Sequence, residues 1–318
     1  MASTRMIQTV TGPVPADKIK GCLIHEHVSV GFPGLWMEFP PNRAAFVEQA
    51  VSEMEKLKSE GISTLIDATP ADLVRDPELL RDVAQRSGMQ IVCAAGYYTE
   101  AEGSSIFFKS RMGSGKAQNE VYRMLRQEIR DGIGDTGIKA GIIKVSTGAH
   151  KITDYENMFL DAAAKVSIEE DVCIITHTDQ GTMGAEQARR LIAAGANPNR
   201  IMIGHLSSFE NYDELKEIFT QGVYGGFDRW GHDFVLPTEP LQFQFVKNLV
   251  ELGYANKILF STDYGLRVLG DDGDRGDLPP KNTWHYIFEK VFPTLSEMGI
   301  SSDVLDSFLN SNALSFLG

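Results

Sequence analysis

Several residues that bind metal ions in proteins stand at the ends of short apolar runs in this sequence. His25 and His27 are separated by one residue within LIHEHV. Side chains two positions apart on a strand point to the same side, so both imidazoles can reach one ion while Glu26 points away. The pair alone is weak as a metal motif, because hydrogen bonds often satisfy a buried histidine. The pair supports a metal site only if other residues of ligand type come together with it in the fold.

Four further residues of ligand type end other apolar runs: Lys144, His177, His205 and Asp263. Imidazole and carboxylate together suit zinc or a similar divalent ion. Because four of the seven histidines fall at such positions, a shared metal site is favoured over separate structural histidines.

Lys144 is the unusual member, because it lies within the apolar run AGIIKVST, where a charged amine is costly to bury. Burial lowers the pKa of a lysine and makes the neutral amine accessible. A neutral amine can add carbon dioxide to give a carbamate, an anion that can bridge two cations. The alternative from spacing alone is a lysine paired with a buried carboxylate.

These residues belong to a rhythm of apolar run, polar loop and amphipathic helical stretch. Runs rich in β-branched residues begin at Leu23, Ser63, Gln90, Ala140, Val172, Arg200, Tyr224 and Lys257. Between the first two, the apolar residues of Arg43–Glu60 fall on one helical stripe. Near-continuous apolar strands are typical of a parallel sheet covered on both faces. The pattern predicts an α/β fold, a (β/α)8 TIM barrel with the site at the C-terminal ends of its strands.

The competing architecture is a doubly wound nucleotide-binding fold, which needs a glycine-rich phosphate turn after its first strand. The segment HEHVSVG at that position is no such turn. No linker rich in proline, glycine or serine divides the chain, so we expect one domain over residues 1–318.

Composition restricts the partners and the compartment. A formal net charge of -13 argues against nucleic acid and against an anionic membrane surface, because both need basic patches. The sequence has no apolar run of about 18 residues for a membrane span and no secretory signal at its start. Cys22, Cys93 and Cys173 lie far apart in apolar runs, and we expect buried, reduced thiols in a cytoplasmic protein.

With these residues assembled, the chain resembles the phosphotriesterase family of the amidohydrolase superfamily. The resemblance runs along nearly the whole chain, in the blocks LIHEHV, AGIIKVSTGAHKIT, IITHTDQG, IMIGHLSS, GGFDRWGHD and ILFSTDYG. It implies a binuclear metal centre, with zinc the first expectation and cobalt, manganese or iron the alternatives. The implied ligands are His25, His27 and Asp263 on one ion, His177 and His205 on the other, and a carboxylated Lys144 bridging them beside a hydroxide.

The resemblance also implies a reaction. Two cations lower the pKa of the bridging water, and the hydroxide attacks the substrate while Asp263 accepts the proton. Tyr97, in AAGYYTE, resembles the tyrosine that phosphotriesterase-like lactonases place over the metal pair. Arg229, in GFDRWGHD, resembles their arginine at the end of strand seven. Together with Asp263 as catalytic residues, these two favour lactones or related carboxylic esters as substrates.

Other interpretations stay open at this point. Tyr97 as an aromatic packed at the barrel rim and Arg229 in a salt bridge with Asp228 are the structural alternatives. Hydrolysis of phosphotriesters or amides by the same centre is the second functional hypothesis. A non-catalytic metal-dependent binding protein is the third, less favoured because every ligand is present. We expect a small-molecule substrate and, by resemblance, a homodimer.

Two segments beside the expected site have unassigned roles. Residues 30–41, VGFPGLWMEFPP, carry Trp36, Met37 and Phe39, which suit a pocket wall or a subunit contact. Residues 264–282 contain the acidic stretch GDDGDRGDLPP, which lacks the ligand spacing of a calcium loop and predicts a solvated lid.

Overall fold

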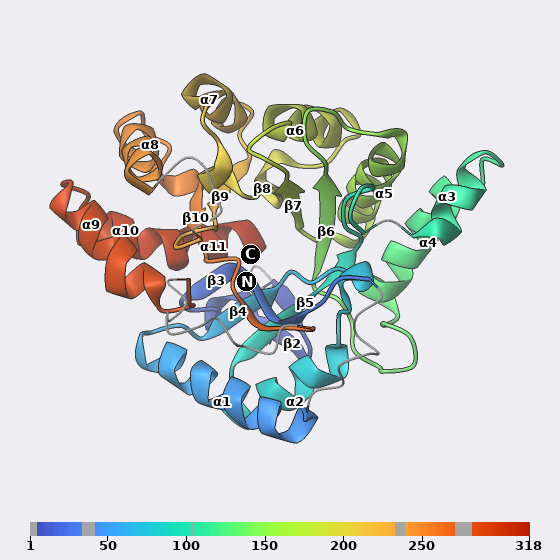
Figure 1. Ribbon diagram of the computed structural model, residues 1–318, viewed down its shortest axis with the longest axis horizontal. Coiled ribbons are helices and arrows are strands. Elements are labelled where there is room, and N and C mark those ends of the chain that lie inside the picture. Colours follow the sequence, from blue (N-terminus) through green and yellow to red (C-terminus); the bar gives the residue numbers. More distant parts are fainter. Residues whose placement is uncertain (1–4, 34–41, 104, 233–238, 271–281) are drawn as a thin grey trace.

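A parallel sheet of nine strands, in the order β10-β9-β8-β7-β6-β5-β4-β3-β11, forms the centre of the molecule. The computed structural model describes residues 5–33, 42–103, 105–232, 239–270 and 282–318. The sheet is curled, and helices lie around its outside (Figure 1). This is an α/β fold consistent with a TIM-type barrel.

All eight predicted strands are confirmed, and one strand was not anticipated. The sheet consists of β3 (Cys22–Val30), β4 (Thr64–Asp67), β5 (Gln90–Gly96), β6 (Ile142–Thr147), β7 (Ile174–Thr178), β8 (Ile201–Ile203), β9 (Tyr224–Phe227), β10 (Ile258–Phe260) and the additional β11 (Gly265–Val268). A separate antiparallel hairpin near the start of the chain joins β1 (Met6–Thr9) and β2 (Gly12–Pro15).

Helices follow the strands along the chain. They are α1 (Arg43–Ser59), α2 (Pro77–Ser87), α3 (Ile106–Met112), α4 (Ala117–Arg130), α5 (Asp154–Glu170), α6 (Gly184–Ala193), α7 (Tyr212–Thr220), α8 (Glu239–Glu251), α9 (Phe292–Glu297), α10 (Ser302–Leu309) and α11 (Ser311–Leu317). Short turns of 3-10 or π geometry cover Ala16–Lys18, Ala71–Leu73, Pro198–Arg200, Leu206–Ser208, Ala255–Lys257 and Ile287–Val291. None of the described helices is long and apolar enough to cross a membrane.

Side-chain caps mark where the helices begin. The side chain of Asn42 accepts a hydrogen bond from the backbone N–H of Ala45 at the start of α1. At the start of α5, Thr153 and Glu156 form a reciprocal capping box. Such caps satisfy N–H groups that have no partner within the helix. The helix predicted over Arg43–Glu60 is therefore present with nearly the expected bounds.

Apolar side chains fill both faces of the sheet, which explains why the strand sequences are almost continuously apolar. On β7, Ile174 belongs to the large cluster between sheet and helices, whereas Ile175 belongs to a second cluster inside the curl. Residues of α11, among them Phe316, close the inner cluster at the N-terminal end of the strands. The inner cluster leaves the opposite end of the curl to polar residues.

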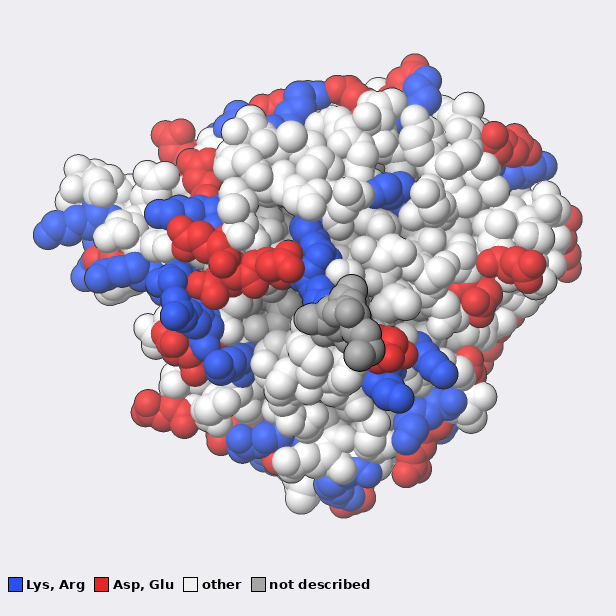
Figure 2. All heavy atoms as spheres, turned by 180° about the vertical axis from the view of Figure 1, so that it is seen from behind, with Lys and Arg blue, Asp and Glu red and all other residues white. Residues whose placement is uncertain are grey.

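The segment after β10 differs from the expected lid. Gly265–Val268 forms β11, which pairs in parallel with β3 and places Gly265 opposite His27. The acidic residues 271–281 lie outside the described residues, as do Trp36, Met37 and Phe39. The predicted buried thiols are confirmed, since Cys22, Cys93 and Cys173 are buried and free. On the face shown in Figure 2, acidic and basic side chains are interspersed.

A glycine at the end of β5 permits a close approach to β6. Gly96 has a φ of +145°, and a Cβ there would stand 1.8 Å from the carbonyl oxygen of Lys144. We expect Gly96→Ala to lower the free energy of unfolding by at least ~2 kcal/mol, because both backbones must shift. Urea denaturation measures the change. Gly113→Ala is the control, since nothing lies within 4 Å of its added Cβ; equal stability of the two variants would contradict the constraint.

Candidate metal centre

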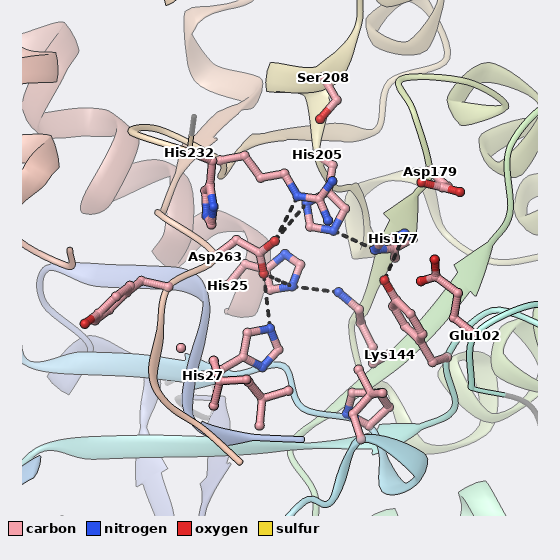
Figure 3. A pocket seen from close by; sticks show the side chains of 18 of the residues that line it. His25, His27, Glu102, Lys144, His177, Asp179, His205, Ser208, His232 and Asp263 are labelled. Atoms are coloured by element: carbon pink, nitrogen blue, oxygen red, sulfur yellow. Dashed lines mark hydrogen bonds and ion pairs between the residues drawn. The ribbon is translucent and has the colours of Figure 1, made fainter. Parts of the chain in front are cut away.

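Six ligand-type side chains meet at the C-terminal end of the curled sheet. They line one cavity of about 830 Å³ (Figure 3), and they are the six predicted from the sequence: His25, His27, Lys144, His177, His205 and Asp263. Five of them are buried, and Asp263 is partly buried.

Strand alternation places two of these residues directly. Ile142 and Ile175 point into the inner apolar cluster from β6 and β7. Side chains two positions farther along a strand point the same way. Lys144 and His177 are therefore directed into the curl, one layer above the apolar filling.

Local irregularities place the other four. The register of β3 against β4 shifts between Leu23 and Glu26, at the point where His25 and His27 enter the cavity. His205 and Asp263 follow the ends of β8 and β10 with φ angles of +60° and +52°. This left-handed conformation costs a residue with a Cβ about 1–2 kcal/mol, so these positions depend on contacts that hold them.

The first group of donor atoms has a spacing suited to a single ion. Asp263 Oδ1 lies 3.1 Å from His27 Nε2 and 3.4 Å from His25 Nε2. Ligands placed about 2.0–2.2 Å from a tetrahedral ion stand ~3.4 Å apart. The three atoms converge, as the sequence hypothesis of a shared ion requires.

The second group lies next to the first. His177 Nδ1 and His205 Nε2 are 2.8 Å apart, and Lys144 Nζ is 2.7 Å from His25 Nε2. Figure 3 shows the amine of Lys144 reaching from the side of His177 toward His25. Lys144 is therefore positioned between the two groups, where a bridging anion on its amine would contact both.

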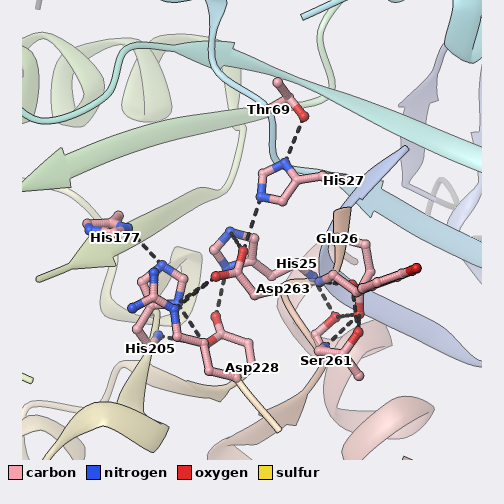
Figure 4. Close-up of polar contacts among 12 residues, drawn as sticks. His25, Glu26, His27, Thr69, His177, His205, Asp228, Ser261 and Asp263 are labelled. Carbon is pink, nitrogen blue, oxygen red and sulfur yellow. Dashed lines mark hydrogen bonds and ion pairs between the residues drawn. The ribbon is translucent and has the colours of Figure 1, made fainter. Parts of the chain in front are cut away.

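Asp228 is a functional residue that the sequence analysis considered only as a partner of Arg229. Its carboxylate lies 2.7 Å from His25 Nδ1 and 3.0 Å from His205 Nδ1 (Figure 4). By accepting both Nδ1–H groups it directs the two Nε2 lone pairs into the cavity. Burial raises the pKa of Asp228, but His205 and His25 outweigh burial and hold it below its usual value. A carboxylate ending the run YGGFD was the available signal.

Asp228 also supplies the contact that holds His205 in its left-handed conformation. The backbone N–H of His205 donates to Asp228 Oδ1 at 2.8 Å. Arg229 turns away from this carboxylate, and its Nε donates instead to Asp263 Oδ2 at 2.9 Å. The salt bridge suggested between Arg229 and Asp228 is thus replaced by one to Asp263.

Glu26, on β3, is hydrogen-bonded to the segment that follows β10. It is fully buried, and its carboxylate accepts hydrogen bonds from Ser261 Oγ, from the backbone N–H and hydroxyl of Thr262, and from the backbone N–H of Tyr264. The backbone N–H of Asp263 donates to the carbonyl oxygen of His25. The side chain of Glu26 therefore points away from the cavity, as expected, and it holds the segment that carries Asp263 against β3.

Electrostatics favour neutral nitrogen ligands. Burial lowers the pKa of His25 and His177, and that of His205 to about 3, so their ring lone pairs are available. Burial also lowers the pKa of Lys144 from 10.5 to about 8. For Asp263 burial acts in the opposite sense, but His205, His25 and Arg229 together hold its pKa well below the usual value. Neutral imidazoles around an ionised carboxylate are a suitable environment for a cation.

Tyr97 does not reach the ligands, and this corrects the sequence prediction. Its ring packs on Phe108 and Phe159, with ring centroids 5.4 Å apart in each pair. Tyr98 lines the cavity instead, with its hydroxyl 3.4 Å from His177 Nε2. The left-handed Gly96 ends β5 just before this pair, so strand alternation no longer indicates which tyrosine turns inward.

Two ring side chains follow Arg229 closely in the sequence, and of these only His232 lines the cavity. Its Nε2 contacts the carbonyl oxygen of Thr262 at 2.8 Å. Trp230 is fully buried and stacks on Phe243 in the outer core, with ring centroids 4.9 Å apart.

Replacing Asp228 tests its control of two histidine ligands. An amide accepts at one atom only, so Asp228→Asn leaves one Nδ1–H without its partner. We expect zinc affinity to fall ~10–100-fold, measured by competition with a coloured chelator. Asp72→Asn is the control, because the partly buried Asp72 accepts the backbone N–H of Tyr98 and contacts no ligand histidine. Equal affinities for the two variants would refute the role.

Comparison with known proteins identifies the family. The phosphotriesterase family model matches residues 5–317. The chain is 30% identical to an aryldialkylphosphatase of Saccharolobus solfataricus over 92% of this chain and 93% of that protein. It is 30% identical to a phospho-furanose lactonase of Mycoplasmopsis agalactiae over 98% and 91% of the two chains. An organophosphorus hydrolase structure from Deinococcus radiodurans, 36% identical, superposes with a TM-score of 0.94 over 100% of this chain and 98% of the other. The chain belongs to the phosphotriesterase family and is a metal-dependent hydrolase.

Proposed function

We propose that this hydrolase opens lactones or related carboxylic esters at a binuclear centre on a closed (β/α)8 barrel. The observation that carries the proposal is the convergence of six ligands with two further polar groups in one cavity. Those groups are the hydroxyl of Tyr98, beside His177, and the guanidinium of Arg229, beside Asp263.

The donor set fits two divalent ions, with zinc the first choice and cobalt, manganese or iron the alternatives. His25, His27 and Asp263 would hold one ion and His177 and His205 the other, with a carboxylated Lys144 shared between them. Bound there, divalent ions supply Lewis acidity that lowers the pKa of water and polarises a carbonyl oxygen.

The chain's own groups handle protons and orientation. Asp263 stays ionised, since its pKa is held low by His205, His25 and Arg229 against the effect of burial, and it is therefore in the form that accepts a proton from water. Arg229 fixes its carboxylate through the 2.9 Å contact to Oδ2. Burial raises the pKa of Tyr98, so its hydroxyl remains a donor for a substrate oxygen.

The role of Lys144 predicts chemical rescue. Lys144→Ala removes the anion that the amine forms when its nitrogen bonds to the carbon of carbon dioxide and releases a proton. We expect loss of most activity and bound metal, with partial recovery of both in added acetate, which supplies a carboxylate in the same space. The wild-type protein in acetate is the control. Full activity of the variant without any acid would refute the bridge.

The same role gives a pH dependence for metal uptake. Burial lowers the pKa of Lys144 to about 8 because it disfavours the charged amine, so the neutral fraction grows as the pH rises from 7 to 8. Zinc uptake by metal-free protein should then accelerate over this interval when bicarbonate is present. An uptake rate independent of bicarbonate would count against the carbamate.

Substrate class is tested with the zinc-loaded protein in a pH-indicator assay. We expect turnover of γ- and δ-lactones to exceed that of an aryl dialkyl phosphate, and Tyr98→Phe to lower lactone kcat/KM by ~10-fold, the value of one hydrogen bond. Tyr97→Phe serves as the matched control, because Tyr97 packs away from the cavity. Dominant phosphate turnover would favour the alternative, organophosphate hydrolysis, which the relationship to the aryldialkylphosphatase supports.

A further inference from the structure

The cavity has two chemically different sides, which follow different strands of the sheet. One side is apolar and consists of Val30, Phe32, Pro70, Leu73 and Val268. These residues lie on or just after β3, β4 and β11, which are neighbours in the sheet. The other side follows β5, which adjoins β4, and β7 and β8 farther along the sheet.

That other side carries carboxylates, and we call it the acidic wall: Glu102, Asp179, Ser208 and Glu210. Asp179 comes directly after β7, and Glu210 follows the turn Leu206–Ser208. Figure 3 shows Glu102 and Asp179 on the side of His177. The two carboxylates lie close enough to Tyr98 that their negative charges add to burial in raising the pKa of its hydroxyl.

The charge of the wall is not compensated within the described part of the chain. None of its three carboxylates forms an ion pair with a described residue, whereas Glu100 nearby is paired with Lys109. The described cationic side chains of the cavity are Lys144 and Arg229, and Arg229 is bound to Asp263. A phosphate group on this side would therefore face like charges, which is unfavourable.

Ser208 independently indicates a ligand on the same wall. It is 6% exposed, and its hydroxyl oxygen is buried with no hydrogen-bond partner among the described residues. Buried hydroxyls are normally paired with protein or with water, so a polar group entering this cavity would give Ser208 the partner that it lacks. A ligand hydroxyl can donate to a carboxylate of the wall and also accept from Ser208. An ammonium group, the other ligand group that carboxylates attract, can donate but cannot accept.

We propose that the acidic wall is a subsite for hydroxyl groups of an uncharged lactone, which makes the protein selective for neutral polyhydroxylated lactones and adverse to phosphorylated ones. The inference rests on the proposed lactone hydrolysis. The ring ester lies at the ligands, with its hydroxyl substituents directed toward Glu102, Asp179, Ser208 and Glu210. The apolar side then covers the opposite edge of the lactone ring.

The test compares three lactones with zinc-loaded protein: an aldono-γ-lactone, its phosphorylated counterpart and unsubstituted γ-butyrolactone. We expect kcat/KM for the aldonolactone to exceed that for the phosphorylated one by at least ~10-fold, which converts to about 1.4 kcal/mol. Changing Glu102→Gln, Asp179→Asn and Glu210→Gln together removes the charge with little change in shape. This ratio should then fall at least ~10-fold. Glu55→Gln, on the exposed side of α1, is the control that keeps the ratio.

A binding measurement separates failure of the subsite from failure of lactone hydrolysis. Lactam analogues of the two sugar lactones, which resist opening, are titrated calorimetrically into the zinc-loaded protein. Tighter binding of the neutral lactam, reduced by the triple variant, supports the subsite even when no lactone is hydrolysed. Equal binding of neutral and phosphorylated lactams overturns the subsite, while turnover of γ-butyrolactone leaves lactone hydrolysis intact.

Discussion

Burial of a lysine beside four histidines dictates the arrangement at the mouth of the curl. Burial disfavours the charged form of a nitrogen group, and for Lys144 it lowers the pKa from 10.5 to about 8. The negative charges next to them, on Asp228 and Asp263, are held by hydrogen bonds from imidazole and guanidinium groups. Each buried group is acceptable only while its neighbours are in place. The strand ends, the left-handed residues His205 and Asp263, and the contacts of Glu26 between β3 and the segment after β10 keep these buried groups next to their partners.

Much of this arrangement could be predicted because it follows from period-two alternation. The eight strands, and the inward direction of Lys144 and His177, need only a strand and a buried side. For Asp228 the available signal was weak, a carboxylate at the end of the run YGGFD, because its importance arises from two histidines that are distant in sequence. The sequence could not distinguish Tyr98 from Tyr97, because Gly96 interrupts the alternation just before them. His205 and Asp263 were found through their residue types, whereas their left-handed backbone had no signal in the sequence.

The proposed chemistry and the proposed selectivity depend on different parts of the molecule. The ligands lie at strand ends, where the hydrogen-bonded sheet fixes them, whereas the acidic wall is built from loop residues such as Asp179 and Glu210. Loops tolerate substitution better than strands do. Relatives that share the ligand geometry can therefore differ in the substrates that they accept, which agrees with the lactonase and phosphatase names found among proteins of similar identity.

The hydrogen bonds of Glu26 to the segment after β10 mean that the site can be completed only late in the synthesis of the chain. Among the described residues, the donors to the carboxylate of Glu26 are Ser261, Thr262 and Tyr264, which are synthesised more than 200 residues later. The ribosome synthesises the N-terminal part of a chain first. A nascent chain that ends before Ser261 therefore carries five of the six clustered side chains. It lacks the groups that donate to Glu26, and it lacks β11, the neighbour of β3. Such a fragment lacks Asp263 as well, so a prematurely terminated chain cannot assemble the six-residue cluster at the mouth of the curl.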